Sequence, residues 1–242
     1  MKNILITGVS KGLGLIIAEV AINQGYTVYG ISRSKTDEFE QLRLKLPEQI
    51  LWKSVDLGNK NLDLNKIIFK EFINNKIPIH GYVNNAAIAY DDIITNLNIE
   101  KLDNMFQVNV YCPMVLTKYC IRNMIYNRVT GSIIHISSVS VHTGYKGLSM
   151  YAATKGAIEA FSKNTAREWG ELGIRSNCIV AGFMETDMSK ILKEDQKTRI
   201  YNRTSLKKST SLESVAETVV FLLSEKADSI TGQNIFVDSG TI

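Results

Sequence analysis

This sequence lacks long apolar runs, a strong charge imbalance and cysteines at metal-ligand spacing. No apolar run approaches the roughly 20 residues of a membrane helix, so we expect no membrane span. A net charge of +4 over 242 residues argues against a nucleic-acid binder. The three cysteines, Cys112, Cys120 and Cys178, are odd in number. We therefore expect buried thiols in the reducing cytoplasm, and no metal site.

Leader and linker signals are also scarce. The first stretch, MKNILITG, becomes polar and glycine-rich too early for a signal peptide, and we expect it to begin a strand instead. The chain has only three prolines, no internal repeat and no Pro/Ser-rich linker. We therefore expect one domain over residues 1–242.

Short β-branched runs alternate with longer helical patterns along the whole chain. The expected strands are 3–7, 27–32, 50–56, 79–84, 132–137, 175–180 and 234–238. The expected helices are 13–24, 35–46, 60–75, 99–127, 150–171 and 212–225. Nearly continuous apolar strands are typical of parallel strands covered on both faces. This alternation predicts an α/β fold of Rossmann type, a doubly wound parallel sheet of about seven strands.

A glycine-rich turn, TGVSKGLGL, follows the first strand, with glycines at 8, 12 and 14. Such a turn lets the backbone approach a pyrophosphate at a helix N-terminus. Glycine turns also serve plain strand-to-helix connections. The position of this turn at the start of a βαβ unit favours nucleotide binding.

The end of the second strand indicates which nucleotide binds. NAD binders usually place a carboxylate there, on the ribose 2′-hydroxyl. This chain has GISRSK instead, with Arg33 and no carboxylate. Arg33 and Lys11 are suited to a 2′-phosphate, although both could also be ordinary exposed cations. We favour NADP(H).

Tyr151 and Lys155 lie four residues apart in SMYAATKGAIEAF, on one face of an expected helix. Alone, this spacing indicates little, because Tyr and Lys occur four residues apart by chance in many solvent-facing helices. It occurs here with a larger ordered set of motifs: TGVSKGLG (7–14), VDL (55–57), NNAA (84–87), VN (108–109), IHISS (134–138), YAATK (151–155), NCIVAGFMETDM (177–188) and ITGQNIFVDSG (230–240). With this set the chain resembles the short-chain dehydrogenase/reductase family from end to end. Within it, the chain most resembles bacterial 3-oxoacyl-[acyl-carrier-protein] reductases.

The resemblance implies catalytic roles for four residues. Tyr151 would protonate the ketone oxygen as hydride arrives at carbon, and Lys155 would lower the phenol pKa from about 10 and hold the nicotinamide ribose. Ser138 would hydrogen-bond the carbonyl oxygen, and Asn109 would hold a water that passes protons to Lys155. Besides Tyr151 and Lys155, the implied cofactor contacts are Gly8, Ser10, Lys11, Gly12, Leu13, Gly14, Arg33, Asp56, Leu57, Asn84, Asn85, Ala86, Gly182, Met184 and Thr186.

The chain departs from the family pattern at several positions. Ala87 replaces a glycine, Ala181 precedes Gly182 where proline is usual, and Ser239 replaces a glycine. None of these carries the proton-transfer chemistry. His135 and His142 match no family role, and we expect His135 to be a satisfied core histidine.

The sequence leaves more than one substrate class open. Val129 and Leu172 stand where related reductases carry arginines that dock acyl carrier protein. The expected substrate lid, about 183–211, is basic, which fits an anionic substrate or an ordinary solvated face. A 3-oxoacyl thioester is the first candidate, and another ketone or alcohol, such as a polysaccharide or secondary-metabolite intermediate, is the second.

Two other functions would be expected to show features that this sequence lacks. A non-catalytic NADP-binding sensor would typically lose Tyr151 or Lys155, and nucleotide-sugar epimerases usually have closer glycines and a larger C-terminal region. By resemblance we also expect a homotetramer, or otherwise a dimer, paired through the helices 99–127 and 150–171.

Overall fold

One parallel sheet forms the centre of the molecule. The computed structural model describes residues 2–186 and 193–242, so residues 187–192 of the expected lid, Lys190 among them, lie outside it. Seven strands pair in parallel in the order β3-β2-β1-β4-β5-β6-β7. Their bounds are β1 Lys2–Thr7, β2 Tyr26–Ser32, β3 Ile50–Ser54, β4 Gly81–Asn84, β5 Gly131–Ser138, β6 Ile174–Ala181 and β7 Asn234–Val237. All seven expected strands are confirmed, with ends shifted by at most two residues.

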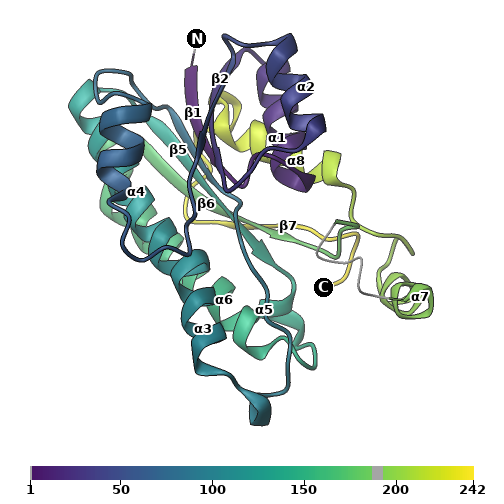
Figure 1. The fold of residues 1–242 in the computed structure, drawn as a ribbon. Coiled ribbons are helices and arrows are strands. Elements are labelled where there is room, and N and C mark those ends of the chain that lie inside the picture. The colour runs from purple at the N-terminus through teal and green to yellow at the C-terminus, as the bar shows by residue number, and fades with distance from the viewer. Residues whose placement is uncertain (1, 187–192) are drawn as a thin grey trace.

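Helices cover both faces of this sheet (Figure 1). One face carries α1 (Gly12–Asn23), α2 (Asp37–Lys45) and α8 (Leu212–Leu223). The other carries α3 (Ile99–Phe106), α4 (Cys112–Asn127) and α6 (Ser149–Trp169). Two further helices, α5 (Ser140–Thr143) and α7 (Glu194–Arg203), follow β5 and β6. The expected doubly wound α/β fold is therefore confirmed. Among the described residues, no helix is long and apolar enough to cross a membrane.

Alternate residues of the strands pack into two apolar layers. Ile4 and Ile6 of β1 lie in the layer that contains α1 and α8. Leu5, between them, lies in the opposite layer with Phe69 and Leu116. Burying one such side chain contributes about 1.5–3 kcal/mol to the stability of the fold. The two layers therefore fix the position of each strand within the sheet.

Two expected helices differ from the structure. The expected helix 99–127 is divided by a π-helical turn, η3 (Gln107–Tyr111), which contains Asn109. Pro113 follows it and has no N–H, so the α-helical bond to the carbonyl of Asn109 cannot form. The expected helix 60–75 is a shorter π-helical segment, η1 (Asn65–Phe72). Its late start follows from Asp63, whose Oδ1 accepts the Lys66 backbone N–H at 3.0 Å.

The order of the strands creates a switch point beside β1. The chain adds β2 and β3 on one side of β1 and then crosses over to add β4 on the other side. In open α/β sheets, ligands bind outside the carboxyl ends of the strands at such a point. The residues after β1, β2, β4, β5 and β6 converge on this edge, and they include most of the predicted site residues.

Candidate active site

Three positions in the turn after β1 require glycine. Gly8 and Gly12 adopt φ values of +69° and +54°, in the left-handed region that favours glycine. A methyl group on Gly14 would lie 2.0 Å from the carbonyl oxygen of Gly8. A methyl group on Gly12 would meet only Thr186 Cγ2, at 3.9 Å. The turn thus leaves open backbone at the N-terminus of α1, as a pyrophosphate requires.

Two further residues of this turn are buried. Leu13 is buried in the layer beneath α1, so its side chain serves packing. Ser10 is buried as well, and its carbonyl accepts the Thr36 hydroxyl at 2.6 Å. This bond ties the glycine turn to the segment that follows β2.

Hydrogen bonds between the ends of β1 and β4 hold the glycine turn. Thr7 Oγ1 accepts the backbone N–H groups of Asn85 and Ala86, both at 3.0 Å. Asn85 Nδ2 donates to the carbonyls of Thr7 (2.9 Å) and Gly8 (3.2 Å). Asn85 therefore holds the turn in place. Thr7 was not among the predicted site residues, although its position directly before Gly8 was a usable signal.

Asn84 points to the opposite face of the sheet from Asn85. Its side chain is buried, with Nδ2 3.2 Å from Nδ1 of His135. Although Asn84 is the last residue of β4, its side chain is therefore buried against β5. Successive strand residues alternate between faces, which explains why the two neighbouring asparagines separate.

The ends of β2 and β3 present one exposed cation and one carboxylate. Arg33 is exposed, and no ion pair forms between it and another described residue. Asp56 is exposed too, and its Oδ1 accepts the backbone N–H of Gly58 at 3.0 Å. Leu57 is buried, and its carbonyl accepts the Cys112 thiol at 3.1 Å. Arg33 thus remains available for an anionic group.

The segment after β6 returns to the same edge. A methyl group on Gly182 would lie 2.3 Å from Thr210 Oγ1 and 2.6 Å from Asp238 Cα, so this position requires glycine. Met184 packs against the layer beneath α1. Ser239, at the position of a usual glycine, adopts a left-handed φ of +58°.

The proton-transfer candidates lie on β5 and α6. Ser138 ends β5, and its Oγ accepts the Ser140 backbone N–H at 3.2 Å. Lys155 is 4% exposed, and its Nζ donates to the Ile136 carbonyl at 2.8 Å. That bond anchors α6, and with it Tyr151, to β5 two residues before Ser138.

The ionisation of the pair differs from expectation. Burial raises the pKa of Tyr151, and the charge of Asp91 raises it further. Burial lowers the pKa of Lys155 to about 8. The structure does not show the expected lowering of the phenol pKa by Lys155, whose Nζ bonds to a carbonyl and lies 5.6 Å from the Tyr151 ring centre. Tyr151 is therefore a protonated phenol near neutral pH.

Asn109 joins three segments beside this pair. Its Oδ1 accepts the Ile88 backbone N–H at 2.9 Å. Its Nδ2 donates to the Ile88 carbonyl at 2.8 Å and to Thr154 Oγ1 at 3.1 Å. The side chain is thus used to hold the loop after β4 against α6, next to Lys155. π-Helical turns such as the one around Asn109 often mark functional sites.

The described part of the lid is attached to the segment after β6. Tyr201 of α7 donates to Glu185 Oε1 at 2.6 Å. Two of the lid's cations are paired on α7 itself, Lys197 with Glu194 at 2.7 Å and Arg199 with Asp195 at 3.7 Å. This local pairing reduces the positive charge that the lid offers to a substrate.

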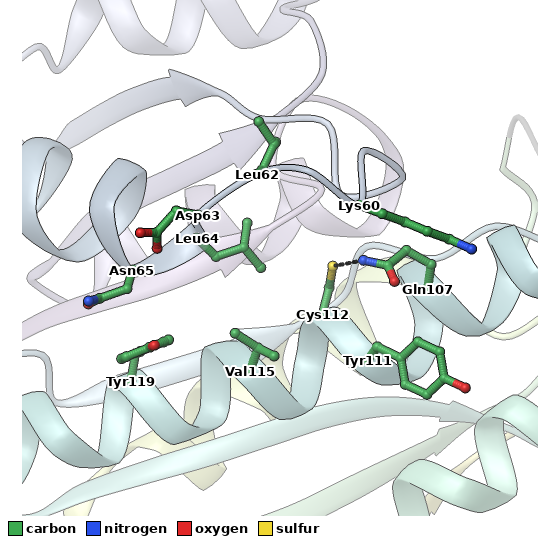
Figure 2. A pocket seen from close by; sticks show the side chains of 10 residues that line it. All are labelled: Lys60, Leu62, Asp63, Leu64, Asn65, Gln107, Tyr111, Cys112, Val115 and Tyr119. Carbon is green, nitrogen blue, oxygen red and sulfur yellow. Dashed lines mark hydrogen bonds between the residues drawn. The ribbon is translucent and has the colours of Figure 1, made fainter.

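A cavity of about 320 Å³ is lined by a different set of residues (Figure 2). It is enclosed by the segment Lys60–Asn65 and by one side of η3 and α4. Gln107 Nε2 donates to Cys112 Sγ at 3.3 Å within it. None of the predicted site residues lines it. Among the described residues, no cluster of three His, Cys, Asp or Glu side chains is placed to hold a metal ion.

His135 is only half satisfied. Its Nδ1 pairs with Asn84, but its buried Nε2 has no hydrogen-bond partner among the described residues. Burial, with a smaller effect of the Lys155 charge, lowers the pKa of His135 to about 3. The histidine therefore stays neutral in the folded protein at all moderate pH values.

This histidine predicts acid sensitivity. Below pH about 6.5 the unfolded chain binds a proton at His135 that the folded protein excludes until about pH 3, so stability falls as pH drops through this window. From pH 7 to 5 we expect a loss of about 2 kcal/mol from this residue. Urea unfolding of wild type and His135→Val at both pH values measures it. An equal pH effect in both proteins would contradict the assignment.

The fold agrees with what comparison with known proteins shows. Residues 8–241 match a family model described as enoyl-(acyl carrier protein) reductase. A 3-oxoacyl-[acyl-carrier-protein] reductase of Buchnera aphidicola is 32% identical and covers 99% of this chain and 96% of its own length. An L-xylulose reductase of Caenorhabditis elegans is 30% identical, with coverages of 99% and 95%.

A solved structure shows the same fold. A 4-hydroxyisoleucine dehydrogenase complexed with NADH superimposes with a TM-score of 0.91 at 22% identity, covering 100% of this chain and 98% of its own. The family match extends over nearly the whole chain, from the glycine turn to the segment after β7. This chain is therefore an oxidoreductase that belongs to the short-chain dehydrogenase/reductase family.

Proposed function

We propose that this protein reduces a ketone to a secondary alcohol with NADPH. The observation that carries the proposal is the placement of Tyr151, a half-buried and protonated phenol, on the helix that Lys155 anchors to β5, the strand that ends at Ser138. A protonated phenol is the form that can give a proton to a ketone oxygen. The glycine turn that would hold the cofactor lies at the same edge of the sheet.

Each residue has one task in this proposal. When bound, the cofactor supplies hydride to the carbonyl carbon. Tyr151 gives its proton to the carbonyl oxygen, and the Ser138 hydroxyl donates a hydrogen bond to that oxygen. After this transfer the Lys155 ammonium can return a proton to the Tyr151 phenolate, and solvent then reprotonates the Lys155 amine. Asn109 holds the loop and helix that shape this proton path.

The backbone of the glycine turn fits a pyrophosphate, and the ends of β2 and β4 fit the adenosine half. Arg33 supports NADPH over NADH, because an exposed guanidinium binds a 2′-phosphate as a charge-assisted pair. Asp56 and the backbone at Asn84, Asn85 and Ala86 would border the adenine and its ribose. Gly182, Met184 and Thr186 would border the nicotinamide.

Arg33→Asp should change the cofactor preference. Loss of a charge-assisted hydrogen bond costs about 1.5–3 kcal/mol, so NADPH affinity should fall roughly 10- to 100-fold or more. NADH affinity should change less than about threefold. Titration of the protein's fluorescence with each cofactor measures both dissociation constants. Arg43, which pairs with Glu40 on α2, provides the charge control as Arg43→Asp. Equal weakening for the two cofactors would refute the 2′-phosphate role.

A 3-oxoacyl thioester is the proposed substrate. The relatives that support it include 3-oxoacyl-[acyl-carrier-protein] reductases at about 30% identity over nearly the whole chain. The described lid residues Lys193, Arg203 and Lys208 form no ion pair with other described residues, and they are suited to an anionic substrate.

A second candidate is a free ketone that no carrier protein presents. Val129 and Leu172, which replace the docking arginines of related reductases, line one apolar groove of about 290 Å³ together with Met124, Ile125, Arg128, Thr130 and Ile174. Such a surface favours an acidic carrier less than paired arginines would. The L-xylulose reductase among the relatives supports a small polar ketone as the alternative.

A substrate panel separates these candidates. NADPH oxidation is followed with acetoacetyl-coenzyme A, a 3-oxoacyl carrier-protein conjugate and free ketones, including ketoses. Turnover of both thioesters with similar kcat/KM supports thioester reduction without tight docking of the carrier. Turnover of free ketones alone would support the second candidate. Bound NADPH with no turnover in the whole panel would overturn the proposal.

Assembly and location follow by resemblance. We propose a homotetramer, or otherwise a dimer, paired through α4 and α6. Tyr111, Val115, Ile125 and Tyr126 expose apolar surface on η3 and α4, as such a contact requires. The three cysteines are free and buried, which accords with the proposed cytoplasmic location.

A further inference from the structure

A buried carboxylate, Glu159, lies on α6 four residues after Lys155. One of its oxygens accepts the Ser137 hydroxyl, and the other accepts Asn234 Nδ2 at 2.7 Å. His142 Nε2 lies 3.2 and 3.1 Å from the two oxygens. Three donors from β5, α5 and β7 thus converge on one side chain that is only 7% exposed.

Burying a carboxylate is costly unless donors surround it. Here Ser137, His142 and Asn234 satisfy it, and His142 is held further by the ring of Phe236, edge-on at 5.0 Å. An apolar residue at position 159 would fill the same space without this cost. The arrangement therefore points to a task that packing alone does not explain.

Two of these donors flank Ser138. Ser137 is the residue before it, and His142 lies in α5, the short helix that follows it. Glu159 itself is on the helix that carries Tyr151 and Lys155. One carboxylate therefore fixes both sides of the Ser138 turn against the helix of the proton donor.

We infer that Glu159 is a positioning residue, which sets the place of the Ser138 hydroxyl relative to the Tyr151 phenol through Ser137 and His142. The inference rests on the proposed ketone reduction, in which both hydroxyl groups meet one carbonyl oxygen. Lys155 anchors α6 through the Ile136 carbonyl, and Glu159 anchors it through the Ser137 hydroxyl. Together the two contacts fix α6 on two consecutive residues of β5, directly before Ser138.

The test is a set of three variants. Glu159→Ala removes all three contacts. Glu159→Gln keeps one oxygen for Ser137 and can donate to His142 in its other tautomer, but it leaves Asn234 unmatched. Ser162→Ala, on the same helix as Glu159, is the matched control, because it removes the 2.8 Å contact of Ser162 with Ser176 of β6 without touching the Ser138 turn.

Misplacement of reacting groups by about 1 Å can lower a rate about 100-fold. We therefore expect Glu159→Ala to lower kcat about 10- to 100-fold, with the NADPH dissociation constant unchanged within about twofold. Glu159→Gln should recover part of the lost kcat, and Ser162→Ala should retain wild-type kcat. A kcat within twofold of wild type for folded Glu159→Ala, or an equal loss in Ser162→Ala, would overturn the inference.

Hydrogen–deuterium exchange separates this inference from the proposed function. Amides of residues 139–148 should exchange faster in Glu159→Ala, while those of the glycine turn should not change. Wild type that reduces no ketone would overturn the proposed function, and the exchange result would still decide whether Glu159 fixes the Ser138 turn. Unchanged exchange over 139–148 would overturn the inference even in an active enzyme.

Discussion

Tyr151→Phe should abolish ketone reduction while leaving NADPH bound. The substitution removes only the hydroxyl, and the ring that packs on α6 remains. Proton donation by a positioned acid is worth about 10²- to 10⁴-fold in rate, so kcat should fall by that factor. The glycine turn and Arg33 lie on other elements, and the NADPH dissociation constant should stay within about twofold.

Single-turnover absorbance of NADPH measures the rate, and fluorescence titration measures binding. Tyr126→Phe is the matched control, since this exposed phenol on α4 has no hydrogen bond within the described chain and should behave as wild type. If Tyr151→Phe retained more than a tenth of the wild-type rate, another group would have to supply the proton.

Gly14→Ala should destroy cofactor binding. Its methyl group would lie 2.0 Å from the Gly8 carbonyl oxygen and 2.6 Å from Asn85 Nδ2. Asn85 cannot move aside freely, because its amide also holds the carbonyls of Thr7 and Gly8. The turn must therefore open, and we expect NADPH affinity to fall more than 100-fold.

Two further glycines distinguish loss of binding from loss of folding. Gly156→Ala, in α6, places a methyl 3.6 Å from Val141 Cγ1 of α5, an ordinary contact, and should stabilise α6 by about 0.5–1 kcal/mol. Gly12→Ala meets no close atom but is strained at φ +54°, so it should fold and still lose affinity. If Gly14→Ala bound NADPH within about threefold of wild type, the proposed role of the glycine turn in cofactor binding would be wrong.

The strands were the most predictable part of the fold. Each is a short β-branched run bounded by turns, and burial on both faces requires nearly continuous apolar residues. The glycine turn was equally visible, because positive φ and close backbone approach leave few alternatives to glycine. These features depend on local sequence, which is why they could be predicted.

The interruption of the long helix was not predicted. The apolar pattern around Asn109 continues through the π-helical turn, and periodicity does not distinguish the two helix types over five residues. The signal was Pro113, whose missing N–H falls four residues after Asn109. The separation of the Asn84 and Asn85 side chains could also have been predicted, because successive strand residues point to opposite faces of a sheet.

The contacts of Glu159 could not be predicted from the sequence. Its three partners lie 17 to 75 residues away along the chain, and only the pairing of β5, α5, α6 and β7 brings them together. The pKa of Tyr151 was mispredicted for the same kind of reason. The Tyr–Lys spacing suggests a nearby positive charge, but burial, which the spacing does not report, has the larger effect.

The most direct test of ketone reduction is the transfer of label from cofactor to product. Wild type is incubated with acetoacetyl-coenzyme A and NADPH that carries deuterium at the hydride position of the nicotinamide, in ordinary water. The proposal predicts a 3-hydroxyacyl product with one deuterium on its carbinol carbon, formed by wild type and not by Tyr151→Phe. NADPH consumption without deuterium at that carbon, or equal product from both proteins, would contradict it.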